Sequence, residues 1–481
     1  MYLTQTDQTN LMLMNNNNVS ASDIIADIIK EDKKSTAKEE MTDGEEYYKI
    51  NNAILKHEFN KVVIDGTPII NPLISNDKLV HAFHHILVNQ KIDYICGNPI
   101  IIQTDVQKNL KSINEILGER FDLLMKKWGT NASNKGNEFL HPYIDKDGKF
   151  RLTIIPSQQI IEIFDQQYQE DRVGVIRYYP IEVKKDRLSP KKTVNKVELW
   201  DHEKTLFLIE EAGKYVLDPD YKENPRYHFY EYNTISPEVK TARSWGKIPF
   251  LKLKNNSLEM SDLRLYKTLI DNYDFSRSQF SNNLRDIQEL FWVLFGAEET
   301  NLGEFVRNLK TYKAMKVPLG AEVDSRKGDI PFESRKEHED KLWEDIWFFG
   351  MGVNWKSDMF KNPPSGVALR TLLIPLDLKS NAMIREWTPA LSELMYYVTY
   401  YLKLSEKIDI DPKVITFKFD KTVIINELEK SQIAQSSKGV ISDETILENH
   451  PWVKDKQLEM ERLEKQNEDI EDLDKVIVDE E

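Results

Sequence analysis

The sequence predicts an α+β fold that is mostly helical and is divided into two or more domains. The first observation is a seam of apolar side chains spaced alternately three and four residues apart, which is typical of a long helix packed on other helices. The second is a series of short strand patterns separated by polar turns, which favours antiparallel pairing. The third is the length of 481 residues, which exceeds what one hydrophobic core usually supports.

Composition and charge limit the class of protein. Hydrophobic residues make up 40% and charged residues 30% of the chain, as in soluble, ordered proteins. The single cysteine, Cys96, excludes an intramolecular disulfide and fits a reducing compartment. We expect no signal peptide and no membrane span, because no run of 18 apolar residues occurs. The net charge of -15 argues against a protein that grips nucleic acid, but not against one that lets DNA slide past.

The N-terminal half begins with a polar stretch and continues as a mixed region. Residues 1–45 predict a mobile arm with one short helix at residues 21–30. Residues 46–243 predict an α/β region with helices at 77–92 and 107–130. Residues 184–195 form a basic loop with a proline. The predicted strands of this region are 150–155, 160–164, 173–180, 196–201, 205–210 and 215–216.

Residues 244–291 predict a strand followed by the long helix. A Trp245-Gly246 turn opens a strand at 248–253, and Ser261 is a suitable N-cap residue for the helix. The helix would run for about 29 residues, or roughly 43 Å at 1.5 Å per residue. Only Arg277 breaks its apolar seam. The seam consists of Leu263, Tyr266, Ile270, Tyr273, Arg277, Phe280, Leu284, Ile287 and Phe291.

Residues 292–332 predict short mixed elements with a strand at 313–317. A second helix and a loop follow them. The helix is expected at 333–350, with Ser334 and Glu337 as a capping box and Gly350 as its C-cap. It carries Trp343, Ile346 and Trp347, together with Leu342. Residues 351–366 form a glycine-flanked loop that could hinge. Its side chains suit contact with a phosphate backbone, although a plain surface loop has the same composition: Asn354, Trp355, Lys356, Phe360, Lys361 and Asn362.

The C-terminal part predicts a third helix and a polar end. Residues 367–430 contain a helix up to about residue 402, in which Pro375 and Pro389 should cause a kink or a break, and a strand at 414–419. Residues 431–481 predict helices after Ser431 and Ser442 and an acidic tail that is frayed or solvated.

Two patterns could carry chemistry. His81, His84 and His85 have helical spacing near Cys96 and could hold a metal, but histidines on an ordinary helix are the favoured interpretation. Asp220, Glu238 and Lys240 mimic the acids and lysine of a metal-dependent DNA nuclease, and Glu182 with Lys184 repeats part of that pattern. Such short patterns arise by chance, and no phosphate-binding loop or nucleophile motif accompanies them. We therefore predict no catalytic residue, no metal and no cofactor, and we keep a nuclease as the alternative.

Five segments in order resemble the portal proteins of tailed bacteriophages, in the branch found in long-tailed phages of Gram-positive bacteria. The first is residues 75–100, which end in a turn with Tyr94, Gly97, Pro99 and Ile100. The others are residues 245–256 with Glu259, Ser261 and Asp262; residues 270–287; residues 365–370; and residues 439–442 with Glu444, Thr445 and Pro451.

The resemblance implies a portal fold with wing, stem, clip and crown, assembled as a ring of about twelve subunits around a DNA channel at one capsid vertex. Residues 46–243 would be the wing, 292–332 the clip, 351–366 the tunnel loop and 431–481 the crown. The seam helix would pack on the helix with Trp343 and Trp347 and on neighbouring subunits.

The resemblance also implies partners and a location. Double-stranded DNA would pass through the channel during packaging and ejection. The other expected partners are the terminase large subunit, the major capsid and scaffold proteins, and a head-tail adaptor. The protein would reside in the virion, and in the host cytoplasm during assembly. An acidic channel would repel the duplex, with Lys356 and Lys361 offering transient contacts. A structural ring or scaffold unrelated to DNA is a third possibility.

Overall fold

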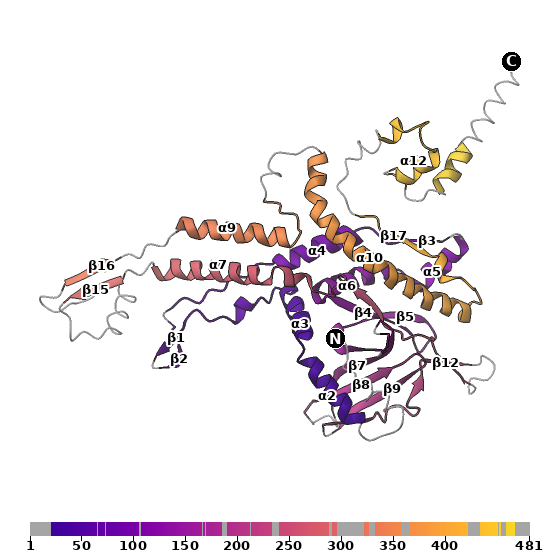
Figure 1. The fold of residues 1–481 in the computed structure, drawn as a ribbon, viewed down its shortest axis with the longest axis horizontal. Coiled ribbons are helices and arrows are strands. Elements are labelled where there is room, and N and C mark those ends of the chain that lie inside the picture. Colours follow the sequence, from indigo (N-terminus) through magenta and orange to yellow (C-terminus); the bar gives the residue numbers. More distant parts are fainter. Residues whose placement is uncertain are drawn as a thin grey trace, which may run out of the picture. The chain divides into compact units, whose positions relative to one another are not determined.

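The computed structural model shows two compact units (Figure 1). Unit 1 comprises Met1–Asn354 and Pro375–Asp420, and unit 2 comprises Trp355–Ile374 and Lys421–Glu481. The structure describes residues 21–64, 66–72, 74–104, 107–165, 167–168, 170–184, 190–211, 213–232, 240–287, 291–295, 322–326, 332–356, 366–421, 433–450, 452–453 and 458–466.

Two helices begin the described chain, α2 (Ala21–Lys33) and α3 (Thr36–Tyr48). Ser35 caps α3, because its hydroxyl accepts a hydrogen bond from the Lys38 amide at 3.3 Å. In α2, Ile25, Ile28 and Ile29 are buried, at helical spacing. The prediction of a mobile arm is therefore wrong for residues 21–45, where an apolar helical face is packed in a core.

That core lies against a six-stranded antiparallel sheet with the order β10-β9-β8-β7-β6, to which β11 adds at β9. The helix α2 contributes its isoleucines to one cluster with Ile161, Ile163 and Ile176 of the sheet. The antiparallel pairing that the sequence predicts is confirmed, although β8 extends into the residues 184–195 that were expected as a basic loop. The strands are β6 (Ile160–Phe164), β7 (Arg172–Val183), β8 (Lys192–Trp200), β9 (Lys204–Glu211), β10 (Lys214–Leu217) and β11 (Arg226–Tyr227).

The largest core packs a three-stranded sheet against three helices. The sheet has the order β14-β4-β5, formed by β4 (Asn137–Ile144), β5 (Phe150–Ile155) and β14 (Leu251–Lys254). The helices are α4 (Phe83–Cys96), α6 (Phe121–Lys135) and α10 (Gly366–Ser405). Trp128 of α6 and Trp387 of α10 are fully buried, with ring centroids 5.5 Å apart. Burial of two indole rings makes this a major contribution to the stability of unit 1.

Two predicted helices differ from the structure. The helix expected at 107–130 is divided into α5 (Gln107–Leu117) and α6, because Gly118 adopts a φ of +73° that ends α5. The helix expected to begin at residue 77 begins at Phe83 as α4. Residues 75–80 have no regular secondary structure, and their backbone is bound by side chains of another helix, as described below.

Among the described residues, four further pairs of short strands are antiparallel, and three single turns of 3-10 helix connect elements in addition to the turn at Asp262–Leu265. The pairs are β1 (Lys61–Ile64) with β2 (Thr67–Ile70), β3 (Ile101–Gln103) with β17 (Thr416–Lys418), β12 (Phe229–Tyr232) with β13 (Lys240–Arg243), and β15 (Phe291–Phe295) with β16 (Glu322–Arg326). The turns are η1 (Ala53–Lys56), η2 (Ser157–Gln159) and η5 (Pro412–Val414).

The long seam helix is shorter than predicted. Ser261 is the expected N-cap residue, but it caps a 3-10 turn, η3 (Asp262–Leu265), after which α7 runs over Lys267–Ile287. Phe291 therefore lies in β15 and not in the helix. The second helix, α9 (Phe332–Phe349), starts before Ser334, so that Ser334 is inside the first turn and is not the cap. Figure 1 shows α7 and α9 side by side, with β15 and β16 beyond their ends.

The helix α10 contains both Pro375 and Pro389 without interruption over its 40 residues. An interruption, which was one of the two effects expected of these prolines, is therefore absent from α10, and the other effect, a kink, stays a prediction. In unit 2, Ser442 caps α12 (Asp443–Asn449) by accepting a hydrogen bond from the Thr445 amide at 3.3 Å, as expected for that helix. The strand predicted at 313–317 and the acidic tail after residue 466 lie outside the described residues.

Candidate functional site

The apolar seam of α7 is buried in its first half within the chain itself. Leu263, Tyr266 and Ile270 are at most 2% exposed, and Tyr273 is 8% exposed. They form one cluster with Leu342, Ile346 and Trp347 of α9, and Trp343 packs against it. Tyr47, Phe83 and Leu87 close the cluster from α3 and α4. These seam residues pack on α9, as expected. Their burial leaves no surface for the contact with neighbouring subunits that was also expected.

The second half of the seam is more open. Phe280 is partly buried and lies 5.9 Å from Phe332 between ring centroids. Leu284 is 49% exposed and Phe332 is 57% exposed, so the distal end of the helix pair presents apolar surface. The side chain of Ile287 lies outside the described residues.

Arg277, which interrupts the seam, bonds to the partner helix. Its guanidinium donates to Oε2 of Glu339 on α9 at 2.8 Å, and the Ser276 hydroxyl lies 3.1 Å from Oε1 of the same residue. Glu339 is only 7% exposed, so its carboxylate would otherwise be buried without a counter-charge. The polar residue in the seam thus compensates a buried acid on α9.

A second seam on α7 was missed from the sequence. Asp274, Ser278, Asn282 and Asp286 recur every four residues, and each binds the backbone of residues 75–81. The contacts are His81 N to Asp274 Oδ1 (3.1 Å), Leu79 N to Ser278 Oγ (2.9 Å), Asp77 N to Asn282 Oδ1 (2.7 Å) and Ser75 N to Asp286 Oδ1 (3.2 Å). We call these contacts the polar ladder. The repeat of short polar side chains at four-residue spacing was the signal in the sequence that could have revealed it.

The spacing of the ladder side chains along α7 matches the spacing of the amides along residues 75–81 for a geometric reason. Four residues of helix rise about 6 Å, and two residues of extended chain cover about 6.6 Å, so alternate amides stay in step with the helix. The segment also bonds to α7 through side chains: Nδ1 of His81 lies 2.6 Å from Asp274 Oδ1, and Arg285 donates to Asp77 at 2.8 Å. The chain is thereby fixed along α7.

The start of the predicted tunnel loop is packed against α4. A Cβ atom at Gly350 would lie 2.7 Å from Leu87 Cδ1, and one at Gly352 would lie 2.2 Å from Leu87 Cδ2. The left-handed residue at the end of α9 is Met351, with a φ of +53°, and not Gly350. These glycines allow close approach to Leu87 in the structure, and the hinge expected at this side of the loop stays a prediction.

Hydrogen bonds hold the next residues. Gln90 of α4 accepts from the Val353 amide at 2.9 Å and donates to the Val353 carbonyl at 3.0 Å. Trp343 Nε1 donates to Asn354 at 3.3 Å. Trp355 is 69% exposed and Lys356 is exposed. Of the predicted loop residues, Phe360, Lys361 and Asn362 lie outside the described residues.

A buried group of charges lies beside this loop root. Asp262 Oδ2 accepts from Lys91 at 2.6 Å and from Lys379 at 3.2 Å, and the Lys379 ammonium also donates to the Gly350 carbonyl at 3.0 Å. Burial alone would raise the pKa of Asp262, but the two ammonium groups and Asn255 outweigh it and hold that pKa below its usual value. Burial lowers the pKa of Lys91 to about 8, with Asp262 opposing the shift. These bonds join α4, η3, the end of α9 and α10.

The candidate metal residues have separate partners. His81 bonds to Asp274, whereas Nδ1 of His84 lies 2.9 Å from the Tyr266 hydroxyl and Nδ1 of His85 lies 2.9 Å from the Tyr48 carbonyl. Burial lowers the pKa of His84 to about 3 and raises the pKa of the Cys96 thiol to about 12. Within the described ranges, no three His, Cys, Asp or Glu side chains are arranged to hold a metal ion.

The candidate nuclease residues are not brought together by the contacts they make. Asp220 pairs with Lys196 at 2.9 Å and is largely exposed, and Lys240 pairs with Glu223 at 2.5 Å. Glu238 lies outside the described residues, and Glu182 pairs with Lys191. Exposed pairs with different partners do not form the buried acidic site that binds Mg²⁺ for catalysis.

None of the helices in the described part of the chain has the length and apolar content needed to span a bilayer.

Comparison with known proteins gives consistent results. Residues 27–472 match the family described as "Phage portal protein, SPP1 Gp6-like". The chain is 29% identical over 432 residues to the portal protein of Bacillus phage SPP1, which spans 89% of this chain and 84% of that protein. It is 30% identical over 439 residues to the portal protein of Clostridium phage phiCD119, which spans 87% of this chain and 90% of that protein.

Solved structures resemble the chain more distantly. A protein in the "Virion of native gene transfer agent (GTA) particle" is 11% identical, with a TM-score of 0.40 over 76% of this chain and 88% of that one. So low a score carries no weight beyond the sequence relatives. The match over residues 27–472 and the two named relatives confirm the resemblance: this chain belongs to the SPP1 Gp6-like family of phage portal proteins and is a structural portal protein of a tailed bacteriophage, not an enzyme.

Proposed function

We propose that identical copies of this chain form a ring of about twelve subunits, because head-to-tail contacts that close generate such rings. The ring would surround a channel at one capsid vertex, through which double-stranded DNA is packaged and ejected. In this proposal α7 and α9 are the stem, β15 and β16 belong to the clip, and residues 46–243 form the wing. Residues 351–366 would be the tunnel loop and residues 431–481 the crown.

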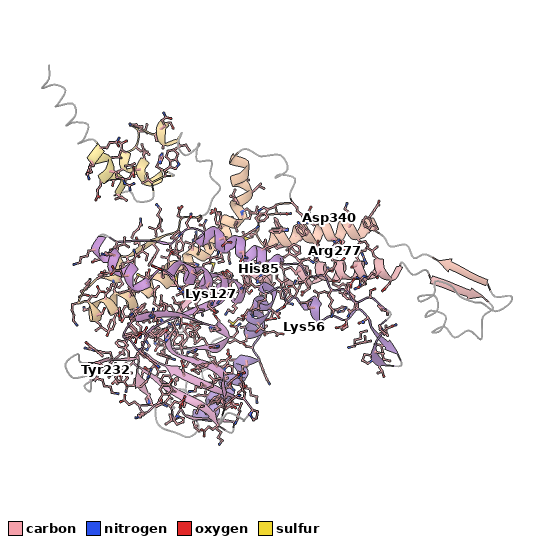
Figure 2. The ribbon with its side chains drawn as sticks, turned by 180° about the vertical axis from the view of Figure 1, so that it is seen from behind. Lys56, His85, Lys127, Tyr232, Arg277 and Asp340 are labelled. Carbon is pink, nitrogen blue, oxygen red and sulfur yellow. The ribbon has the colours of Figure 1, made fainter. Side chains whose placement is uncertain are left out.

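The observation that supports a DNA channel is the contrast between the two faces of α9. One face carries Glu339, Leu342 and Ile346, which are buried against α7 and its neighbours. The opposite face carries four exposed acids at helical spacing and an exposed base, Lys341, which lies 3.7 Å from Glu344. The acids are Glu333, Glu337, Asp340 and Glu344. Figure 2 labels Asp340 on this helix. A helix fixed by one face and acidic on the other suits the wall of a channel that repels DNA.

A repulsive wall would lower friction between the duplex and the protein. DNA affinity depends on Lys and Arg that neutralise phosphates, so a ring of acids at the wall keeps the duplex in the aqueous centre of the channel. The net charge of -15 per chain acts in the same direction. The exposed Trp355 and Lys356 would contact the DNA backbone only in passing, together with Asn354, Phe360, Lys361 and Asn362.

The partners follow from this role. The terminase large subunit would supply the ATP hydrolysis, because the sequence has no phosphate-binding loop of its own. The clip would dock the terminase and later a head-tail adaptor, and the major capsid and scaffold proteins would contact the outer wing. The ring would assemble in the host cytoplasm and remain in the virion.

Two measurements test the proposal. Electron microscopy of the purified protein should show rings with an axial hole of roughly 20–40 Å, wide enough for duplex DNA. The variant E337K/D340K should package DNA more slowly at low salt and recover as salt screens the added charge. Its control is E203K/E211K, an equal change of net charge at exposed positions near β9. A purified protein without rings, or equal rates for both variants, would contradict the proposal.

A further inference from the structure

The β1–β2 hairpin carries apolar side chains that no described part of its own chain covers. Val63, Ile69 and Ile70 are 69%, 47% and 62% exposed, and every residue of β2 is exposed. A two-stranded hairpin with open edges is marginal by itself and is usually stabilised by a further strand or a packed helix. The hairpin therefore has the surface of an element that is completed by another molecule.

The base of the hairpin is nevertheless firmly held. The Asn71 amide donates to the Asn60 carbonyl at 2.8 Å, and Lys78 donates to the Leu55 carbonyl at 3.0 Å, which joins its two arms. Phe59 lies 5.4 Å from Phe275 of α7 between ring centroids. The polar ladder then fixes residues 75–81 along α7 in one register. Because this order exists before any contact forms, little further entropy is lost when a partner binds.

The same part of the stem presents matching apolar surface. The last rung of the ladder is at Ser75 and Asp286, at nearly the same height along α7 as Leu284, which lies on another face of the helix and is 49% exposed. Phe332 at the start of α9 is 57% exposed and lies close to Phe280 of α7. Figures 1 and 2 show the hairpin at the level of this end of α7. The hairpin and the apolar end of the stem thus lie at one height along the helices.

We infer that the β1–β2 hairpin docks on a second copy of this chain, at the exposed apolar end of that copy's α7 and α9. The inference rests on the proposed ring. Rotation about an axis parallel to the stem leaves the height of every group unchanged, so the hairpin of one subunit meets Leu284 and Phe332 of the next. The contact would bury apolar surface that each copy alone leaves in water. The polar ladder acts here as the element that sets the height of the hairpin.

The test compares ring assembly of four full-length proteins by sedimentation and electron microscopy. V63K/I70K should raise the concentration at half assembly at least tenfold, because two ammonium groups would enter an apolar contact. L284K should have a similar effect from the other side. The matched control is L123K on α6, since Leu123 is 68% exposed, nearly the same as Val63. All four proteins should show the same circular dichroism, because each change is at an exposed position.

The outcomes separate this inference from the proposed ring. If wild-type protein forms rings and V63K/I70K or L284K assembles at the wild-type concentration, the hairpin contact is refuted and the ring remains. Normal assembly of V63K/I70K with failure to enter capsids would assign the hairpin to another protein, and would equally refute the inference. If the wild-type protein forms no ring, both proposals fail.

Discussion

Replacing Arg277 with methionine tests why a charged residue stands in the apolar seam of α7. The side chain of Arg277 is 41% exposed, whereas that of Glu339 is 9% exposed. Arg277→Met keeps the length and the apolar stem, but it removes the donor at 2.8 Å from the Glu339 carboxylate. Among the described residues, the Ser276 hydroxyl at 3.1 Å then remains as the hydrogen-bond donor to Glu339. The variant should therefore loosen the contact between α7 and α9.

The expected loss lies between two limits. Removal of one partner of a fully buried pair costs about 3–5 kcal/mol, and an exposed pair contributes about 0.2–1 kcal/mol. Since the arginine is partly solvated and one hydrogen bond to Glu339 remains, we expect about 1.5–3 kcal/mol. At 1.4 kcal/mol per factor of ten, amides of α7 and α9 that exchange by local opening should exchange roughly 10- to 100-fold faster. R277M/E339L, which removes both charges, should recover most of the loss.

Hydrogen exchange of peptides from α7 and α9, read by mass spectrometry on unassembled protein, measures this loss locally. The control is Arg264→Met, because Arg264 pairs with Glu40 at 3.5 Å and its side chain is 60% exposed. Exchange in R264M should stay within about threefold of wild type, as expected for an exposed pair. Exchange in R277M that is no faster than in R264M would refute the view that Arg277 is present to compensate Glu339.

Three further results are expected from the loop root and the buried charges. Gly352→Ala should cost about 1–3 kcal/mol in thermal unfolding, because its Cβ would lie 2.2 Å from Leu87 Cδ2. The same substitution made in a Leu87→Ala chain should cost less than in the wild-type chain, and an unchanged G352A would contradict this. Asp262→Asn should cost about 3–5 kcal/mol, since two buried ammonium groups lose their counter-charge, and a soluble variant melting like wild type would count against it. Burial lowers the pKa of His84 and His141 to about 3, so the unfolded chain binds more protons below about pH 6.5, and stability should fall as the pH falls from there towards 3. His141→Gln should make this fall less steep between pH 6.5 and 5, and identical slopes would exclude His141 as a cause.

The sheet elements could be predicted because their signals are local. The strands at 150–155 and 160–164 agree with β5 and β6 residue for residue. Each is a short run rich in β-branched and aromatic residues bounded by turns, and its ends depend little on distant parts of the chain. The packing of α2 was not predicted, because the polar composition around this helix concealed the apolar pairs on one of its faces. Of these apolar residues, Ile25, Ile28 and Ile29 are buried.

The loop root could not be predicted because the reason for its glycines lies elsewhere in the chain. Gly350 and Gly352 could permit motion or close packing, and the sequence alone does not distinguish these uses. The deciding atoms belong to Leu87, more than 260 residues earlier in the chain. The buried charges are similar: Lys91, Asp262 and Lys379 meet only after three helical elements have packed, and none is unusual in its own segment.

The two seams of α7 restrict how neighbouring copies can use this helix. The apolar seam, exemplified by Tyr266 and Ile270, faces the chain's own core, and the polar ladder binds residues 75–81 on an adjacent side. At 100° per residue, the remaining face carries uncharged polar side chains, which are Thr268, Asn272, Gln279 and Asn283. A contact made only through that face would bury little apolar surface and would depend on hydrogen bonds, whose net contribution is about 1 kcal/mol each. Copies that form the proposed ring therefore require apolar contacts outside this face. Exposed apolar side chains lie on the β1–β2 hairpin, at the distal end of α7 and α9, and at Phe348 and Phe349 near the other end of α9.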